Sequence, residues 1–155
     1  MHAIKAGDSI IDPDGGKEAW AFMPTMVLPD LYRMASETYA TEHVYSVDGT
    51  PSVGDVLDPA PIDPNTLTAL APTWKTILVA GLNKGGKGYY ALDVTDPDNF
   101  SKDGVLFEFT DADDRDMGNV VAAPQLVRMR VPSATPGQAD EYRWFCLLYT
   151  SDAAD

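Results

Sequence analysis

The chain has 155 residues, enough for one domain or for part of a larger one. Its 24 Asp and Glu against 11 Lys and Arg give a formal charge of −13, which argues against binding to nucleic acid or to anionic lipid. No apolar run approaches the roughly 18–20 residues that cross a bilayer, so we expect no membrane insertion. The 12 Gly and 12 Pro favour short strands and turns.

The first third of the chain predicts short strands around one helix. Residues 1–5 begin in an extended pattern, and residues 18–23 place aromatic side chains two apart, which is the period of a half-buried strand. Residues 29–35 predict a short helix, with Pro near its start and apolar residues at helical spacing. Residues 43–47 and 51–56 predict two further strands.

The rest of the chain predicts an insertion followed by a series of strands. Residues 57–73 contain four prolines and little periodicity, so we expect an exposed and mobile insertion. Residues 74–80 form the strongest strand pattern in the chain, and a Gly-rich turn separates them from a strand over residues 88–95. Further strands are predicted over residues 105–110, 123–129 and 142–145.

The last ten residues are set aside from fold arguments. Residues 146–155 match the in-frame translation of a transposon-end sequencing adaptor, so we interpret them as a non-native tail. On this interpretation the domain lies within residues 1–145 and the natural product continues past Phe145. The single cysteine, Cys146, then supports neither a disulfide nor a thiol nucleophile.

An internal repeat organises the predicted strands. Residues 2–4 resemble residues 90–92, and residues 20–22 resemble residues 107–109 at nearly the same spacing. A second pair of matches joins residues 50–53 to 123–126 and Trp74 to Trp144. Four-stranded units repeated around an axis define a β-propeller. We therefore predict an all-β, partial propeller with one complete blade over about residues 50–110 and a partial blade on each side; a small β-sandwich is the alternative.

The candidate chemical motifs are weak. Residues 81–88 fit G-x-x-x-x-G-K, but Gly88 stands where a phosphate loop needs Ser or Thr, and a strand follows instead of a helix. We interpret them as a hairpin turn. The acidic run 111–116 could offer oxygen ligands to calcium, but Arg115 breaks the EF-hand spacing, so a solvated turn is favoured. His2 and His43 lack the companions of a zinc site.

The aromatic side chains are assigned to packing between blades. Trp20, Trp74, Phe107 and Phe109 occupy strand positions, and we expect them in the core. The sequence shows no Gly-x-Ser-x-Gly elbow and no Ser/His/Asp triad pattern. We therefore assign no catalytic, cofactor-binding or metal-binding residue to this chain.

Residues 74–82, 85–95 and 106–109 resemble one blade of the PilC/PilY family. These are bacterial type IV pilus assembly and tip-adhesin proteins with a C-terminal propeller related to those of quinoproteins, and the resemblance covers nearly all of residues 1–145. It implies an exported protein at the cell surface, pilus, outer membrane or periplasm, with pilus components and surface receptors as partners. It also implies calcium-dependent control in the full-length protein, but the family's calcium-loop motif has no match here.

Two functions follow as hypotheses. The first is a non-enzymatic propeller scaffold that supports pilus assembly, extension and retraction, and surface attachment. The alternative is a fragment of a dehydrogenase that uses pyrroloquinoline quinone, since those enzymes share the propeller. Such an enzyme is expected to show a vicinal Cys pair, a Trp platform and calcium-holding acids, which the missing blades could hold. Neither hypothesis places a cofactor in this chain.

Overall fold

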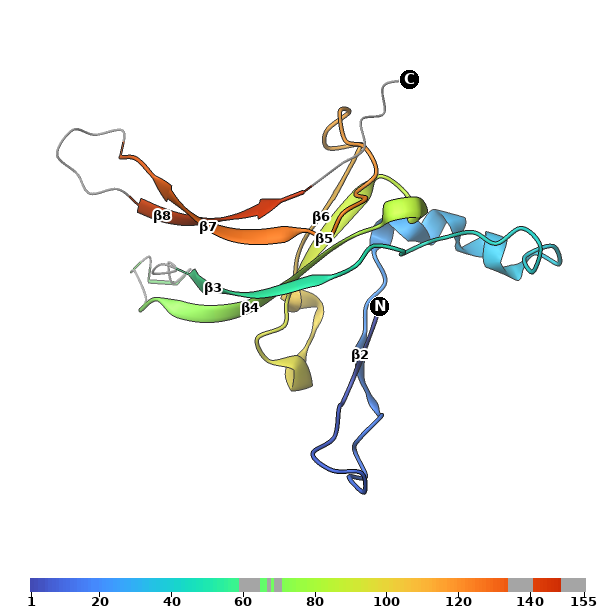
Figure 1. The fold of residues 1–155 in the computed structure, drawn as a ribbon, viewed down its shortest axis with the longest axis horizontal. Helices are drawn as coiled ribbons and strands as arrows, with labels where there is room; N and C mark the ends of the chain where they lie inside the picture. The colour runs from blue at the N-terminus through green and yellow to red at the C-terminus, as the bar shows by residue number, and fades with distance from the viewer. Residues whose placement is uncertain (59–64, 67, 69–70, 134–140, 149–155) are drawn as a thin grey trace.

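A computed structural model describes residues 1–58, 65–66, 68, 71–133 and 141–148. Within them, three antiparallel sheets follow one another along the chain (Figure 1). The first pairs β1 with β2, the second has the order β3-β4-β5-β6, and the third pairs β7 with β8. The bounds are β1 His2–Ile4, β2 Glu18–Ala21, β3 Ser52–Asp58, β4 Thr73–Gly81, β5 Gly88–Asp93, β6 Val105–Thr110, β7 Gln125–Val131 and β8 Glu141–Leu147. The predicted all-β class, with one short helix, is confirmed.

The central four-stranded sheet buries both of its faces. Side chains alternate along a strand, so Leu78 and Ala80 of β4 face one way while Ile77 and Val79 face the other. The first face packs with Leu92 of β5 and with side chains of the β1–β2 region. The second packs with apolar side chains of β7 and β8. Figure 1 shows β7–β8 lying over β3–β4, and the β1–β2 hairpin extending from the opposite side.

The two outer sheets repeat halves of the central one. In the β1–β2 pair Ala3 lies opposite Trp20, and in the β5–β6 pair Ala91 lies opposite Phe107. Both ladders shift register at the next residue, Ile4 in the first and Leu92 in the second. A bulge is a specific local feature, so the same bulge at matched positions is strong support for a repeated unit. The prediction of one complete four-stranded blade with a partial blade on each side is confirmed.

The tryptophan match in the second half of the repeat is wrong by two residues. Val53 of β3 lies opposite Leu78, and Leu126 of β7 lies opposite Cys146. Four residues further along β3 and β7 are Leu57 and Arg130, which lie opposite Trp74 and Tyr142. Trp74 is therefore equivalent to Tyr142. A shift of two residues keeps a side chain on the same face. Trp144 therefore lies on the same face of its sheet as the true equivalent of Trp74, but two residues away from it.

The predicted helix over residues 29–35 is longer and of another type. It is the 3₁₀-helix η1, Thr25–Ala35, with Pro29 inside it. Its first turn begins at Thr25 because Glu108 of β6 accepts hydrogen bonds from the Thr25 backbone N–H at 3.0 and 2.9 Å and from its hydroxyl at 3.3 Å. These bonds satisfy a donor that a helix start leaves without a partner.

The strand predicted over residues 43–47 is absent, since no ladder forms over these described residues. The nearby segment reaches the central sheet through one backbone bond, from Asp48 N to Leu82 O at 3.2 Å. Its rings contact one another instead, with the His43 ring edge-on to that of Tyr45 and the ring centres 5.0 Å apart. β-prone residues thus form aromatic contacts where no neighbouring strand is available.

The predicted insertion over residues 57–73 begins and ends inside strands. β3 runs to Asp58 and β4 begins at Thr73. Most of the residues between them, and the mobility expected for them, lie outside the described residues. At the other end, β8 continues past Phe145 through Cys146 and Leu147, while residues 149–155 of the predicted tail are also outside the description.

Glycine allows the closest approaches around the central sheet. A Cβ at Gly81, the last residue of β4, would lie 2.5 Å from the Cβ of buried Val120, and one at Gly88 would collide with the Met26 sulfur. In the turn between them Asn83 and Gly86 both have positive φ, 49° and 144°. The Gly-rich run is therefore the hairpin turn between β4 and β5 that the sequence predicted.

Candidate functional site

The loops that lead into β3 and join β4 to β5 meet at one end of the central sheet. Helix η1, residues 44–46 and the β4–β5 turn line a cavity of about 140 Å³. A second cavity of about 400 Å³ shares two of its lining residues, Arg33 and Val44. We call the two cavities together the loop-end pocket. Segments far apart in the sequence converge here, as expected for a binding site carried on loops.

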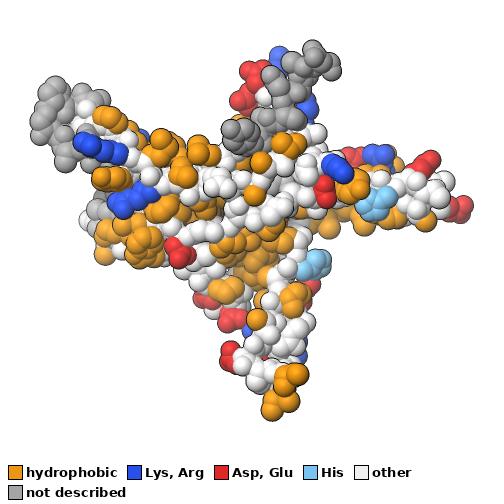
Figure 2. Space-filling view, viewed as in Figure 1, with side chains coloured by type: hydrophobic (Ala, Val, Ile, Leu, Met, Phe, Trp, Pro, Cys, Tyr) orange, Lys and Arg blue, Asp and Glu red, His pale blue; other side chains and the backbone are white. Residues whose placement is uncertain are grey.

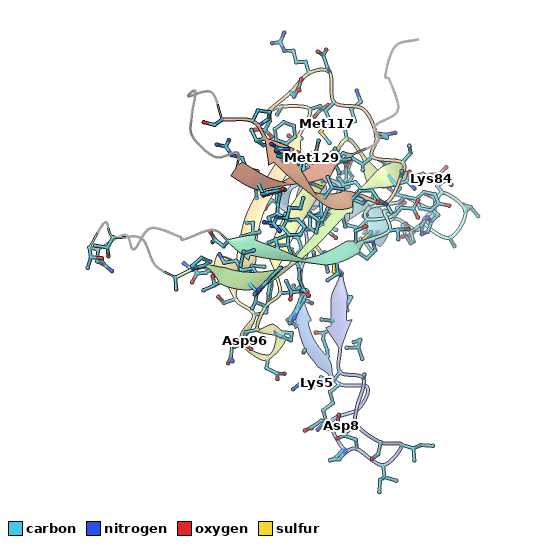
Figure 3. The ribbon with its side chains drawn as sticks, turned by 60° about the vertical axis from the view of Figure 1, so that its left-hand side comes forward. Lys5, Asp8, Lys84, Asp96, Met117 and Met129 are labelled. Atoms are coloured by element: carbon cyan, nitrogen blue, oxygen red, sulfur yellow. The ribbon has the colours of Figure 1, made fainter. Side chains whose placement is uncertain are left out.

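A row of rings and one cation forms the side of the loop-end pocket. The Lys84 ammonium lies 4.9 Å from the centre of the Tyr45 ring, a distance suited to a cation–π contact. His43 packs on Tyr45, and Tyr39 packs on His43 with ring centres 5.2 Å apart. Figure 3 shows Lys84 among the dense side chains beside η1. Lys84 and Tyr45 thus line the smaller cavity side by side.

A second concave surface lies between the central sheet and the β7–β8 sheet. This groove of about 420 Å³ is lined mainly by apolar side chains such as Leu57, Ile77 and Trp144. Lys75 also lines it, with Nζ 3.3 Å from an Asp58 oxygen and 3.8 Å from an Asp93 oxygen. Because two carboxylates hold this ammonium, the groove offers apolar surface rather than an anion site.

The acidic run over residues 111–116 forms a turn. The Asp113 carboxylate accepts hydrogen bonds from Thr110 N at 2.9 Å and from its hydroxyl at 3.2 Å, and Asp114 accepts one from Asp116 N at 3.0 Å. These carboxylates bond to their own loop, as the solvated-turn interpretation expects. Among the described residues no group of three or more His, Cys, Asp or Glu side chains is placed to hold a metal ion.

Two further candidates also make local contacts. His2 Nδ1 pairs with the Glu18 carboxylate across the β1–β2 ladder, and His43 lies between the rings of Tyr39 and Tyr45. Asp12 accepts hydrogen bonds from the backbone N–H groups of Asp14 and Asp8, which lower the pKa of its carboxyl. The assignment of no catalytic, cofactor-binding or metal residue remains a prediction.

The aromatic prediction holds for Trp20 and fails for Trp74. Trp20 packs against the core cluster and stacks on Phe100 with ring centres 4.2 Å apart. Trp74 is 62% exposed, because it lies at the start of β4 and burial along this strand begins only at Ile77. Phe107 is 43% exposed, although its ring meets Tyr89 edge-on. An aromatic residue in a strand is therefore buried only where another layer of side chains covers its face of the sheet.

Sequence reasoning missed the loop-end pocket. Arg33 and Lys84 belong to separate elements, and their approach depends on how η1 folds against the β4–β5 turn. Lys84 was noticed only as part of a rejected phosphate-loop pattern. No local spacing in the sequence signals the pocket, whose lining brings together two cations, two carboxylates, tyrosine rings and hydroxyl groups.

No protein-family model matches the chain. Among curated proteins, a "Type IV pilus biogenesis factor PilY1 homolog" of Xylella fastidiosa is 36% identical over 81% of this chain, and PilY1 of Pseudomonas aeruginosa strain UCBPP-PA14 is 33% identical over 74%. The chain spans about a tenth of the length of these relatives, 9% of each. The crystal structure of the P. aeruginosa PilY1 C-terminal domain aligns with 74% of this chain and 19% of its own, with 31% identity and a TM-score of 0.48.

The repeated strand pairing and the two-sided packing of the central sheet define this chain as a segment of a β-propeller. The resemblance seen in the blade residues agrees with the curated relatives. The chain belongs to the PilC/PilY family of type IV pilus biogenesis proteins.

Proposed function

We propose that the protein containing this chain acts in type IV pilus biogenesis, with this chain as a non-enzymatic propeller scaffold. The observation that carries the proposal is the 32–36% identity to PilY1 pilus biogenesis factors over 74–81% of the chain. The proposed scaffold supports pilus assembly, extension and retraction, and surface attachment. Its partners would be pilus components and surface receptors.

The distribution of apolar side chains supports a scaffold role. Tyr90 and Leu92 of β5 are fully buried, and both faces of the central sheet pack against neighbouring sheets. A rigid blade of this kind can hold loops such as those of the loop-end pocket in fixed positions for partners. The role requires no cofactor in this chain, and we assign any calcium dependence to residues elsewhere in the full-length protein.

We propose a location at the bacterial surface, pilus, outer membrane or periplasm, following the pilus role. Among the residues that the structure describes, no helix is both long and apolar enough to cross a membrane. The acidic charge of −13 disfavours nucleic acid as a partner. The names of the relatives favour the pilus hypothesis over the quinone-dependent dehydrogenase.

Deletion and complementation in a bacterium that carries the gene test this proposal. Deletion should remove surface pili and twitching motility, and the wild-type gene should restore both. The Ile77→Asp variant should fail to restore them, because it places a charge between two packed sheets. Trp74→Asp, in the same strand but exposed, should restore them. Unchanged pili after deletion would contradict the pilus role, and a stoichiometric quinone absorbance in the purified protein would contradict the non-enzymatic role.

A further inference from the structure

Two cations without ion-pair partners line one small cavity of this acidic chain. Lys5, Lys17 and Lys75 each lie within 4 Å of a carboxylate oxygen. Arg33 and Lys84 make no such pair within the described part of the chain, although both line the smaller cavity of the loop-end pocket. In a molecule with a formal charge of −13, this is a local site where an anion would be favoured.

The cavity walls limit the size and charge of that anion. The smaller cavity, about 140 Å³, lies below the roughly 300–1,000 Å³ of sites for drug-sized ligands and suits a single side-chain group. Asp30 lines it too, and its carboxylate would repel a second negative charge. Within the smaller cavity one guanidinium, one ammonium and one carboxylate give a formal charge of +1, which matches a group with one negative charge.

The larger cavity provides space for chain on either side of that group. It shares Arg33 and Val44 with the smaller cavity and adds the apolar surfaces of Tyr32 and Ala35. Ser36, Thr38 and Glu42 line the same cavity, and the Thr38 hydroxyl donates a hydrogen bond to the Glu42 carboxylate at 2.9 Å. This wall therefore carries a negative charge and favours uncharged residues on either side of the acidic group. This mixture of apolar surface and hydrogen-bonding groups suits a peptide better than an inorganic ion.

We propose that the loop-end pocket binds a peptide segment of a partner protein that carries a single acidic residue, with its carboxylate held between Arg33 and Lys84. The planar guanidinium of Arg33 can donate two parallel hydrogen bonds to a carboxylate, while Lys84, positioned over Tyr45, contributes a point charge. The residues flanking the acidic one occupy the larger cavity. This assignment does not depend on the proposed pilus function.

Polyanions are disfavoured as ligands of the pocket. A nucleic-acid strand or an anionic lipid surface presents many charges, and beyond the pocket these would meet the acidic remainder of the chain. Screening limits the repulsion to about 8–10 Å at physiological salt, so a short segment with a single acidic group avoids most of it. A peptide carboxylate is therefore the favoured ligand.

Nuclear magnetic resonance titration of the full chain tests the proposal. The probe is a ten-residue peptide of alanine and leucine with one central glutamate and blocked ends; the same peptide with glutamine is its control. The glutamate peptide should shift the Arg33 side-chain and Gly85 amide signals saturably, and the glutamine peptide should bind at least about fivefold more weakly. Arg33→Gln and Lys84→Gln should each weaken binding about two- to fivefold, as expected for exposed charges.

Matched variants separate a specific site from general charge. Lys87→Gln removes the same charge from the same turn without altering the pocket lining, so binding should stay within about twofold of wild type. Asp30→Asn should tighten binding. Equal affinity for the glutamine peptide, equal loss in the Lys87 and Lys84 variants, or no saturable shift would overturn the proposal. Tighter Arg33-dependent binding of inorganic phosphate or of phosphatidylglycerol vesicles would overturn it in favour of a general anion or lipid site.

Discussion

The β1–β2 and β5–β6 hairpins share one strand pairing but differ in the loops that join their strands. Both ladders have a bulge at the same position, after Ala3 and after Ala91. The β5–β6 loop turns through two short 3₁₀ segments and directs Phe100 inward onto Trp20. The β1–β2 loop projects from the molecule, as Figure 2 shows, and leaves Ile10 and Ile11 at 103% and 86% exposure.

This difference shows that the blade requires a fixed strand register but not a fixed loop conformation. Strand register must repeat, because a slip of one residue would turn every buried side chain of β5 to the other face. The loops carry no such requirement, and each is stabilised by its own contacts: Asp12 caps the first and Asp96 the second. Lys5 of the first loop pairs with Asp98 of the second at 2.7 Å, so the loops of successive blades also touch.

The largest effect is expected at the paired positions Leu92 and Ile4, which follow the two bulges. Leu92 is fully buried, so Leu92→Ala should lower the free energy of unfolding by about 2–5 kcal/mol. Ile4 is 55% exposed, and Ile4→Ala should cost less than about 1 kcal/mol. Urea unfolding of the full chain measures both. Equal losses would mean that the two hairpins share burial as well as register.

An intermediate effect is expected from the loops. Phe100→Ala removes the stack on Trp20 and should cost about 2 kcal/mol, since an aromatic pair adds to the burial of the ring. Ile10→Ala in the equivalent loop should change stability by no more than about 0.5 kcal/mol. Thermal unfolding at one protein concentration compares them. A larger loss from Ile10→Ala would show that the projecting loop has a partner in solution.

The smallest effect at neutral pH is expected at Tyr90, which is equivalent to exposed His2. Burial raises the pKa of the Tyr90 hydroxyl to about 12, against an ordinary value of about 10. Its contribution to stability is therefore complete below pH 10 and is lost as the pH rises towards 12, because only the unfolded chain ionises in that window.

Replacing the hydroxyl tests this window. Tyr90→Phe should change stability at pH 7 by no more than about 1 kcal/mol, because the buried hydroxyl has no protein hydrogen-bond partner among the described residues. Between pH 10 and 11.5 the wild type should lose more stability than the variant, by at most about 1.4 kcal/mol per pH unit. Parallel pH profiles in urea unfolding would refute the assignment.

The sequence predicted the strands better than their surroundings. The complete blade was located from the apolar pattern of β4 and β5 and from the repeated Ala-Leu and Ala-Ile elements. A strand that is buried on both faces needs apolar residues at nearly every position, so its sequence is easily recognised. The strand expected over residues 43–47 failed, since β-prone residues do not reveal whether a partner strand is near. Trp74 failed for a related reason: its residue type does not reveal that burial along β4 begins only at Ile77.

The loop-end pocket lay beyond sequence reasoning. Its cations come from η1 and the β4–β5 turn, and the start of η1 depends on Glu108, a residue of a strand 83 positions further along the chain. Contacts at this separation leave no periodic pattern. The family resemblance supplied the blade and its order but gave no information about which loop residues meet.

A disulfide placed between stacked sheets tests the blade arrangement most directly. A Cβ built on Gly54 of β3 would lie 3.6 Å from the Leu126 Cβ of β7, within the 3.5–4.5 Å range of disulfides. In a Cys146→Ser background, the pair Gly54→Cys and Leu126→Cys should form this bond on mild oxidation, as seen by mass spectrometry of the digested chain. The pair Gly54→Cys and Val127→Cys, with the second thiol on the opposite face, should not. Equal bonding in both pairs, or none in the first, would contradict the stacking of these sheets as successive blades.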